Sequence, residues 1–380
     1  MINLDYAATA PMSPLALQGY IEAAEEMYGN ASSLHDLGGR AKELLEASRT
    51  MIALALHGDA KGLYFTGSGS EANILAIQSL LNGIDEPHKN EIICSTFEHS
   101  SIKLYMEHLK EKGYIVKKIS PDSGGRILPI QLEPLLTENT ALVTIQQGNS
   151  ETGILQDIGR ISPYLKEKGI LFHSDCVQTF CKIPIFAKEW GIDAISISAH
   201  KVFGPKGIGA AYINTKTRWQ PVLPGTTHEY GFRSGTVNVP GIASFAIAVK
   251  ELSSCMEENQ QQLRKLRNCL KRLLKDHSVN AAFIEGELQL PGIAGLVLEN
   301  MEGQYALLSC NQHEIAISAG SACQAGMQMP SETVTSLGYS SEEALRFIRV
   351  SMSAKTTEDE LLSFTKVLQN VRLEAGIGKD

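Results

Sequence analysis

The sequence lacks several features that define other classes of protein. It has no run of 18 consecutive apolar residues, which a membrane-spanning helix needs. Its first residues, MINLDYAATAPM, have neither the basic region nor the apolar stretch of a signal peptide. Basic residues are not in excess either, because the net charge is −8. We therefore expect a cytoplasmic protein that binds neither membranes nor nucleic acid directly.

Paired cysteines are also missing. The seven cysteines are odd in number and scattered, which is typical of reduced thiols in a cytosol. Cys176 and Cys181 are the closest pair, but they lack the usual zinc spacing and no second pair completes four ligands, so we expect no metal site. Cys323 differs from the rest. It lies in ISAGSACQAGMQMPS, a stretch of small residues with no apolar stripe to bury a thiol.

The chain is long enough for about two domains, at 380 residues with 43% hydrophobic residues. Short apolar runs alternate with amphipathic segments from about residue 60 to 215, which predicts an α/β fold with a largely parallel sheet. Seven such runs occur: GLYFTG, EIICST, YIVKKIS, ALVTIQQ, GILFHSD, DAISISA and IGAAYI. We expect one long helix over about 244–276 and a mixed α+β pattern after it.

The first predicted strand end contains glycine and serine. In FTGSGSEANILAI a strand runs into residues 66–70, and a helix is expected to start at about Glu71. Glycines allow close backbone approach, and the free N–H groups of a helix N-terminus bind a phosphate. The alternative is an ordinary helix-capping turn. The P-loop pattern is not matched, since it ends in Gly-Lys-Ser/Thr.

Two further strand ends contain charged residues. Asp175 closes the run GILFHSD, where a buried carboxylate needs a cation such as a protonated pyridine nitrogen. Lys201 follows DAISISA, where desolvation makes a lysine a Schiff-base nucleophile. The alternatives are a helix-capping Asp and a solvated surface Lys, with Lys206 as the lesser candidate. Together, a phosphate cradle, a buried acid and a lysine are the groups that pyridoxal phosphate requires.

The stretch SAHKVFGPKGIGA resembles the cofactor-lysine motif of the NifS/IscS cysteine desulfurases, which are fold-type I pyridoxal-phosphate enzymes of the class V aminotransferase family. Further matching motifs follow in order: LDYAATAPM, GNASSLH, EHSSI, ETGILQDI, RSGTVNV, SAGSACQAG and IRVSMSAKTTEDE. The resemblance implies a large cofactor-binding domain (15–250) with a mostly parallel seven-stranded sheet. A smaller α+β domain (251–380) would be joined by the N-terminal segment (1–14) and would carry the Cys323 loop.

The resemblance also assigns roles to residues around the cofactor. Lys201 would form the Schiff base, Asp175 would pair with the pyridine nitrogen, and Gln178 would bond the ring oxygen. The residues that would hold the phosphate are Gly69, Ser70, Ser198 and His200. His99, in FEHSS, would stack on the ring and assist proton transfer, although a histidine in such a place is otherwise more often a core or loop residue. Thr236 would reach the phosphate of a neighbouring subunit, which implies a homodimer.

Three positions depart from the family pattern. Family members commonly have Asn-Asn-Glu where this chain has Asn149-Ser150-Glu151, and the second Asn is the usual ring-oxygen contact. Ser150 is shorter, so that contact is lost, mediated by water or passed to Asn149. Cys176 stands where Ala is frequent, and Ala10 replaces a common Thr.

The remaining assignments concern the substrate, which the resemblance implies is L-cysteine, converted to L-alanine. Arg349 would clamp the substrate carboxylate with its planar guanidinium, with Arg346 as a rival and a surface charge as the alternative. Asn30 and His35 resemble pocket-wall residues. Cys323 would take the sulfur as a persulfide and pass it to an acceptor protein, which would use the sulfur for iron–sulfur clusters, thio-cofactors or tRNA thiolation. The alternative is that Cys323 is an incidental loop thiol.

The same fold supports other activities, because a fold does not fix a function. A class V aminotransferase, or a cysteine or selenocysteine lyase, would use the same lysine, acid and phosphate cradle. A catalytically inactive partner protein that retains the fold is a third reading. Only Cys323 and its loop favour the desulfurase. The sequence does not identify the sulfur acceptor.

Overall fold

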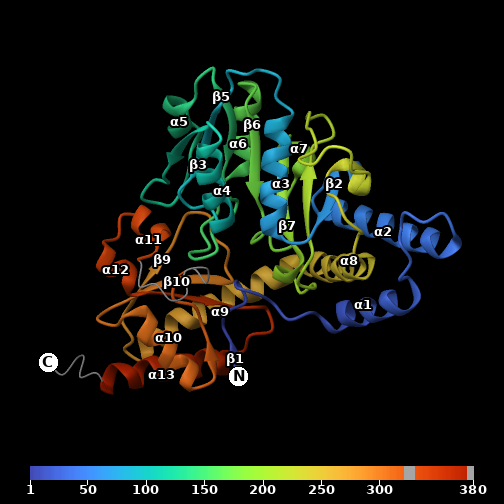
Figure 1. Cartoon of the computed structure of the whole chain (residues 1–380). Helices are drawn as coiled ribbons and strands as arrows, with labels where there is room; N and C mark the ends of the chain where they lie inside the picture. The colour runs from blue at the N-terminus through green and yellow to red at the C-terminus, as the bar shows by residue number, and fades with distance from the viewer. Residues whose placement is uncertain (321–329, 375–380) are drawn as a thin grey trace.

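A computed structural model describes residues 1–320 and 330–374 of the chain. All seven predicted strands form one sheet in the order β2-β8-β7-β6-β5-β3-β4, which confirms the expected α/β fold (Figure 1). The strands are β2 (Leu63–Thr66), β3 (Glu91–Ser95), β4 (Ile115–Ile119), β5 (Thr140–Thr144), β6 (Leu171–Asp175), β7 (Ala194–Ser198) and β8 (Gly209–Ile213). Neighbours from β4 to β7 are parallel, and β8 runs antiparallel to both β7 and β2.

Helices cover both faces of this sheet. Alternate residues of a strand point to opposite faces, and in β2 Leu63 and Phe65 enter one apolar core while Tyr64 enters the other. The first core contains residues of α2 (Asp36–Ala55), α6 (Ile158–Glu167) and α8 (Val239–Ser254), and the second contains residues of α3 (Gly69–Asn82) and α4 (Ser100–Glu111). Three further helices belong to this part of the chain: α1 (Pro14–Glu26), which packs on α8, α5 (Pro129–Leu132) and α7 (Ala187–Trp190).

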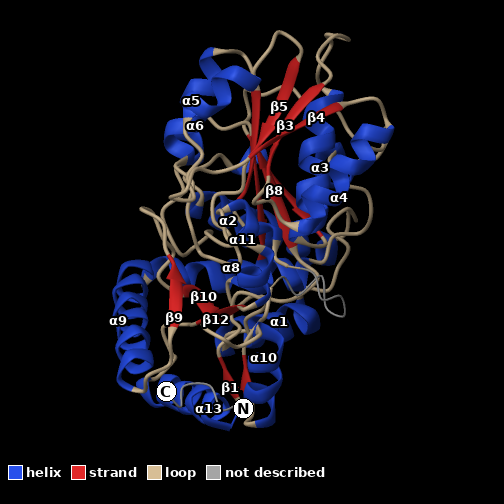
Figure 2. Cartoon of the chain, turned by 90° about the vertical axis from the view of Figure 1, so that its left-hand side faces the viewer, coloured by secondary structure: helices blue, strands red, loops and turns tan. Residues whose placement is uncertain are grey.

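The C-terminal part has its own sheet and its own apolar core. Strand β10 (Ile293–Leu298) lies between β9 (Ala281–Ile284) and β12 (Phe347–Ser351), antiparallel to both. The helices of this part are α9 (Met256–Asp276), α10 (Gly303–Gln312), α11 (Glu332–Ser336), α12 (Ser341–Leu345) and α13 (Glu358–Glu374). Figure 2 shows this part below the large sheet, together with the N-terminus.

The N-terminus pairs with the C-terminal part of the chain. Strand β1 (Ile2–Asn3) lies parallel to β11 (Ile315–Ala316), and Leu4 is buried in the same core as α9, α10 and α13. After Leu4 the chain crosses to the large sheet. The division into domains 15–250 and 251–380, joined by segment 1–14, stays our interpretation.

The expectation of one helix over 244–276 was wrong, because α8 and α9 are separate and bent by 70°. Helical periodicity continues across the break, so the pattern did not reveal it. Cys255 has non-helical torsions, φ −128° and ψ 23°. Ser254 Oγ and Cys255 Sγ both bond the Glu251 carbonyl, and side chains that bond the backbone in this way compete with the helix.

The helices of the described residues are at most 21 residues long. No single helix among them is long and apolar enough to cross a membrane, and α8 and α9 reach the required length and composition only as a bent pair.

Candidate active site

A cavity of about 380 Å³ lies at the carboxyl ends of the parallel strands. This is where ligands bind in open α/β sheets. Eleven of the residues predicted for the site line it: Gly69, Ser70, His99, Asn149, Ser150, Asp175, Gln178, Ser198, His200, Lys201 and Arg349. The fold therefore gathers residues that are up to 280 positions apart in the sequence, from Gly69 to Arg349.

The loop after β2 forms an anion cradle at the start of α3. Ser68 caps the helix by accepting the Glu71 N–H at 3.1 Å, so α3 begins at Gly69 rather than at Glu71. The N–H groups of Gly69 and Ser70, in the first turn, have no acceptor within the helix. A Cβ at Gly69 would lie 2.8 Å from Val177 Cγ2, so glycine is required by close packing. The buried Ser198 Oγ has no hydrogen-bond partner among the described residues.

Asp175 is held at the end of β6, where it is 6% exposed. Its Oδ1 accepts the Val177 N–H at 2.9 Å, and its Oδ2 accepts from Asn73 Nδ2 at 2.8 Å. No described lysine or arginine forms an ion pair with it. Asn73 was missed by the sequence reasoning; the available signal was a polar residue among apolar ones in EANILAI. The cavity thus has a carboxylate that is fixed in place and forms no ion pair within the described part of the chain.

His99 is fixed by the first turn of α4. Its Nδ1 accepts the Ser101 N–H at 3.2 Å and lies 2.9 Å from Ser101 Oγ. Asn73 Nδ2 donates to the same Oγ at 3.2 Å, so the Ser101 hydroxyl donates onward to His99. The proton of the neutral ring is thereby assigned to Nε2. Burial lowers the pKa of His99, opposed by the nearby Asp175 charge.

Lys201 closes the short 3₁₀ turn that follows β7. Its Nζ donates to the carbonyls of Ala7 and Ala8 at 2.6 and 2.7 Å. Burial, together with the Lys201 charge, lowers the pKa of the neighbouring His200 to about 4, so this imidazole is neutral at neutral pH. His200 Nδ1 lies 3.1 Å from Thr9 Oγ1. Lys206 is exposed and does not line the cavity, which favours Lys201 as the functional lysine.

The structure also separates the two candidate arginines. Arg349 is 3% exposed and lines the cavity, whereas Arg346 lines a different hollow on the smaller sheet. Arg349 Nη2 pairs with Asp5 at 2.6 Å, and Nη1 donates to the Ser150 carbonyl at 2.9 Å. Its buried Nε has no partner among the described residues. Asp5, a residue that the sequence reasoning missed, thus sets the direction of the guanidinium.

Asn149 organises its own turn in this structure. Its Oδ1 accepts the N–H groups of Glu151 and Thr152 at 2.9 and 2.8 Å, and the Thr152 hydroxyl at 3.0 Å. Its Nδ2 donates to the Phe97 carbonyl at 3.3 Å. The carbonyl oxygen of this amide is therefore fully used, and a contact from Asn149 to a cofactor ring stays a prediction.

Three predicted site residues lie apart from the cavity. Asn30 Oδ1 bonds the Ser32 N–H, and His35 Nδ1 caps α2 by accepting the Gly38 N–H, both on an exposed loop. Thr236 is exposed in the loop before α8. Their roles stay predictions. Cys323 lies outside the described residues.

Glu98 is a second acid beneath the cavity, also missed from the sequence. It is 3% exposed; Oε1 accepts the Gln146 N–H at 2.6 Å, and Oε2 has no partner among the described residues. Burial, followed by the Asp175 charge, raises the pKa of Glu98 from 4.5 to about 8. Glu98 is thus a neutral acid at neutral pH.

The raised pKa of Glu98 predicts a pH-dependent effect on stability. Between about pH 4.5 and 8 the unfolded state releases the Glu98 proton and the folded state keeps it, so stability falls as pH rises. We expect the free energy of unfolding of Glu98→Gln to exceed that of wild type. The difference should increase by on the order of a few kcal/mol between about pH 5 and pH 8. Denaturant unfolding at both pH values measures this margin, with the exposed Glu86→Gln as control. A margin that is independent of pH would contradict it.

The residues of the cavity fit pyridoxal phosphate. The α3 N-terminus and the unpartnered Ser198 hydroxyl suit its phosphate, and the buried Asp175 suits its protonated pyridine nitrogen. Lys201 lies on the same cavity, and neutral His99 offers a ring face. These residues therefore suit the phosphate, the pyridine nitrogen, the aldehyde and the ring face of the cofactor.

Comparison with known proteins agrees with this fit. The family described as Aminotransferase class-V matches residues 2–364. The NifS protein of Bacillus subtilis is 48% identical over 95% of this chain and 92% of its own length, and a cysteine desulfurase of Nostoc sp. is 33% identical over 98% and 92%. A solved structure described as a NifS-like protein superposes with a TM-score of 0.90 at 30% identity, covering 98% of this chain and 99% of that one.

The fold, the cavity and these similarities agree along nearly the whole length of the chain. Enzymes of this family depend on pyridoxal phosphate, so the cofactor predicted from the strand ends is confirmed at the level of the family. The chain belongs to the class V aminotransferase family, and within that family it is similar to the NifS-type cysteine desulfurases.

Proposed function

We propose that this chain is a pyridoxal-phosphate-dependent cysteine desulfurase that converts L-cysteine to L-alanine and carries the sulfur on Cys323. The observation that carries the proposal is one cavity in which a buried acid, a lysine and a carboxylate-binding arginine meet at the strand ends. The similarity to relatives named as cysteine desulfurases supports the choice of reaction.

Several residues of the cavity would hold the cofactor. When bound, pyridoxal phosphate supplies a ring that accepts electrons from the substrate carbon and makes its bonds labile. The α3 N-terminus (Gly69 and Ser70), with Ser198 and His200, would hold the phosphate, and Asp175 would hold the pyridine proton. Gln178 would bond the ring oxygen, and His99 would stack on the face of the ring.

The substrate is oriented by its carboxylate. Arg349 is held by Asp5 and the Ser150 carbonyl, which leaves its buried Nε available to an anion. A guanidinium binds a carboxylate in a defined plane, so this contact also fixes the direction of the substrate side chain. Lys201 Nζ then moves the proton of the substrate α-carbon, with His99 assisting.

Sulfur transfer requires a nucleophile, and we assign this to Cys323. Its thiolate bonds to the substrate sulfur while the carbon–sulfur bond breaks. The electron pair remains with the carbon, which takes a proton and becomes the methyl group of alanine. The Cys323 persulfide then passes its outer sulfur to an acceptor protein. The acceptor would deliver this sulfur for the synthesis of iron–sulfur clusters or thio-cofactors, or for the thiolation of tRNA.

We further propose a cytoplasmic homodimer with a site shared between subunits. Exposed large apolar side chains occur at several places in the described chain, and a group of them lies on α1 and the loop that follows it: Leu17, Ile21, Tyr28 and Leu34. Leu34 is fully exposed, at 105% of its reference area, next to the predicted pocket-wall residues Asn30 and His35. A partner subunit that covers this region would also bring Thr236 near the second site. The six described cysteines are all free thiols, which fits a reducing compartment.

The rival functions differ from a desulfurase in their products. A cysteine lyase releases pyruvate with the sulfide, and an aminotransferase consumes a keto acid. We expect purified protein, given L-cysteine and excess thiol reductant, to form alanine and sulfide in equal amounts with no pyruvate. Quantifying all three products tests the proposal. Pyruvate in amounts equal to sulfide would establish a lyase instead.

A further inference from the structure

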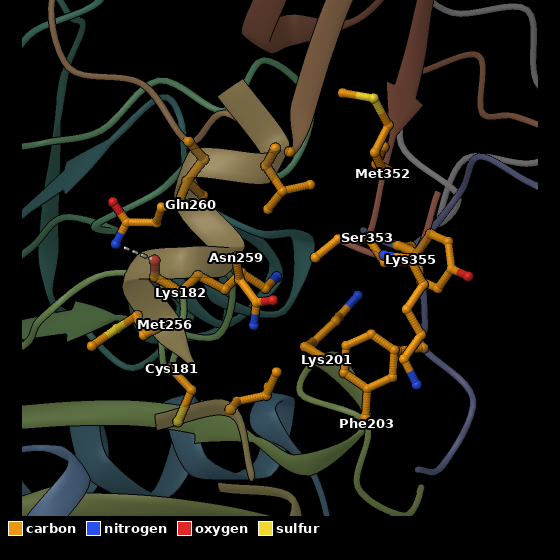
Figure 3. Close-up of a pocket in the computed structure, with 18 of the residues that line it drawn as sticks. Cys181, Lys182, Lys201, Phe203, Met256, Asn259, Gln260, Met352, Ser353 and Lys355 are labelled. Atoms are coloured by element: carbon orange, nitrogen blue, oxygen red, sulfur yellow. Dashed lines mark hydrogen bonds between the residues drawn. The ribbon is translucent and has the colours of Figure 1, made fainter. Parts of the chain in front are cut away.

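A second cavity, of about 200 Å³, lies behind Lys201 (Figure 3). It is lined by the bend between α8 and α9, by residues 290–293 and 351–355, and by the N-terminal segment. Most of its lining is apolar. Lys201 and Ala7 line both this cavity and the candidate active site, so the two hollows meet at the lysine.

A second lysine enters the same cavity from the turn after β6. Figure 3 shows the side chains of Lys182 and Lys201 extending into it from different elements. Lys182 Nζ donates to Oε1 of Gln178, which lies four residues earlier in the sequence, at 3.3 Å. Gln260 Nε2 holds the Lys182 carbonyl at 2.9 Å and so anchors its backbone to α9. No carboxylate of the described residues forms an ion pair with Lys182.

The contacts of Gln178 connect the two lysines. Gln178 Nε2 donates to the Ala7 carbonyl at 2.9 Å, and Lys201 Nζ donates to the same carbonyl at 2.6 Å. The chain of bonds is therefore Lys182 to Gln178, Gln178 to Ala7, and Ala7 to Lys201. An ammonium group only donates, so Lys182 fixes the amide with Oε1 toward itself and Nε2 toward the active site.

We propose that Lys182 is a positioning residue, which fixes the orientation of the Gln178 amide and places a positive charge behind Lys201 that favours the uncharged form of the Lys201 nitrogen. The inference rests on the role proposed for Lys201 above and extends it. It assigns to Lys182 no contact with substrate or cofactor.

The surroundings of Lys182 support this electrostatic role. Burial first, and the Lys201 charge second, lower the pKa of Lys182 to about 7, so the charge behind Lys201 is present below about pH 7 and is lost above it. The interaction is mutual, because a like charge disfavours the charged form of both partners. Other titratable or charged groups face the two lysines from the elements packed around them: Cys181, His99, Asp175, His200, Glu251, Arg349 and Lys355.

The test is an absorbance titration of the bound cofactor in the holoenzyme without substrate. The absorption reports the proton on the nitrogen of Lys201 that is linked to the cofactor. We expect Lys182→Met to raise the titration midpoint by about half a pH unit or more, because a neighbouring positive charge is removed. An apolar side chain suits the apolar cavity, so the variant should keep the melting temperature of the wild type. An unchanged midpoint in the folded variant would overturn the proposal.

Three further variants separate charge from position. Lys182→Arg keeps the charge and should keep the midpoint within about 0.2 pH unit. Lys182→Gln keeps a donor for Gln178 without the charge, so it should shift the midpoint but weaken cofactor binding less than Lys182→Met does. Lys355→Met changes an exposed lysine of the same cavity and should leave the titration midpoint and cofactor binding unchanged. Equal shifts in Lys182→Arg and Lys182→Met would exclude a charge effect and overturn the proposal.

The titration is independent of turnover. A holoenzyme that binds the cofactor but makes pyruvate would overturn the desulfurase proposal and leave the role of Lys182 standing. A wild-type protein without any titrating cofactor absorption would overturn the role of Lys201, and the inference with it.

Discussion

Replacing Lys201 by alanine is expected to reduce alanine formation from L-cysteine by at least about 10³-fold. Lys201 lines the cavity that also contains Asp175, and its Nζ lies 2.6 Å from the Ala7 carbonyl. Lys103, the other described lysine of this cavity, is paired with Glu332 at 2.8 Å, which favours Lys201 as the amine that bonds the cofactor and moves the α-carbon proton. The rate is measured as alanine produced by protein saturated with pyridoxal phosphate.

The Lys201→Ala protein should still bind pyridoxal phosphate, because the α3 N-terminus, Ser198 and Asp175 remain in place. Its bound cofactor should show the absorption of a free aldehyde rather than that of the lysine-linked form. Lys206→Ala is the matched control, since Lys206 is exposed five residues later and outside the cavity. If Lys206→Ala lost activity and Lys201→Ala kept it, the assignment of the functional lysine would be wrong.

Replacing Cys323 by alanine is expected to abolish the release of sulfide under thiol reductant, with a loss of at least about 10³-fold. Removing a nucleophile that bonds directly to the transferred atom eliminates the step, since no other group takes the sulfur. Cys323 lies outside the described residues, so this prediction rests on the sequence and on the family. Alanine, sulfide and pyruvate are quantified with wild type beside the variant.

Cys255→Ala is the matched thiol control for this experiment. Cys255 is the one described cysteine that is not fully buried, and its Sγ bonds the Glu251 carbonyl at 3.2 Å. We expect it to retain turnover close to that of wild type. Turnover that is indifferent to Cys323→Ala would eliminate the persulfide mechanism and leave a lyase or an aminotransferase with an ordinary loop thiol.

Much of the large sheet was predictable because its signals are local. Except for the edge strand β4, the strands are short buried runs rich in apolar residues, and burial on both faces of a largely parallel sheet produces such runs directly. The polar residues Asp175 and Lys201 stand at or just after the ends of β6 and β7, and parallel strands bring their carboxyl ends to one edge. The cavity at that edge follows from topology alone.

The break at Cys255 was not predictable from periodicity. Apolar residues recur at helical spacing on both sides of it, so the pattern indicates a single helix. At the break, Cys255 has non-helical torsions, and the side chains of Ser254 and Cys255 both bond the Glu251 carbonyl. Such bonds depend on side-chain rotamers, which residue spacing does not specify.

The choice between Arg346 and Arg349 also needed the structure. In β12, Phe347 packs between the two parts of the chain, whereas Ile348 and Val350 enter the core of the smaller part. Residues of a strand alternate between faces, so Arg349 shares the face of Phe347, toward the cavity. The sequence shows two arginines that are three positions apart. Only the pairing of β12 with β10 decides which of them lies on the face of the strand that is directed toward the cavity.

The sequence by itself determined the fold class, the cofactor and the residues that stand at the strand ends, because local apolar runs and motifs encode them. Tertiary structure alone decided the partners of those residues: Asn73 for Asp175, Asp5 for Arg349, and Lys182, through Gln178, for Lys201. The first two pairs are 102 and 344 positions apart in the chain. Hydrogen bonds act over about 3 Å, so contacts of this kind exist only once the chain has folded.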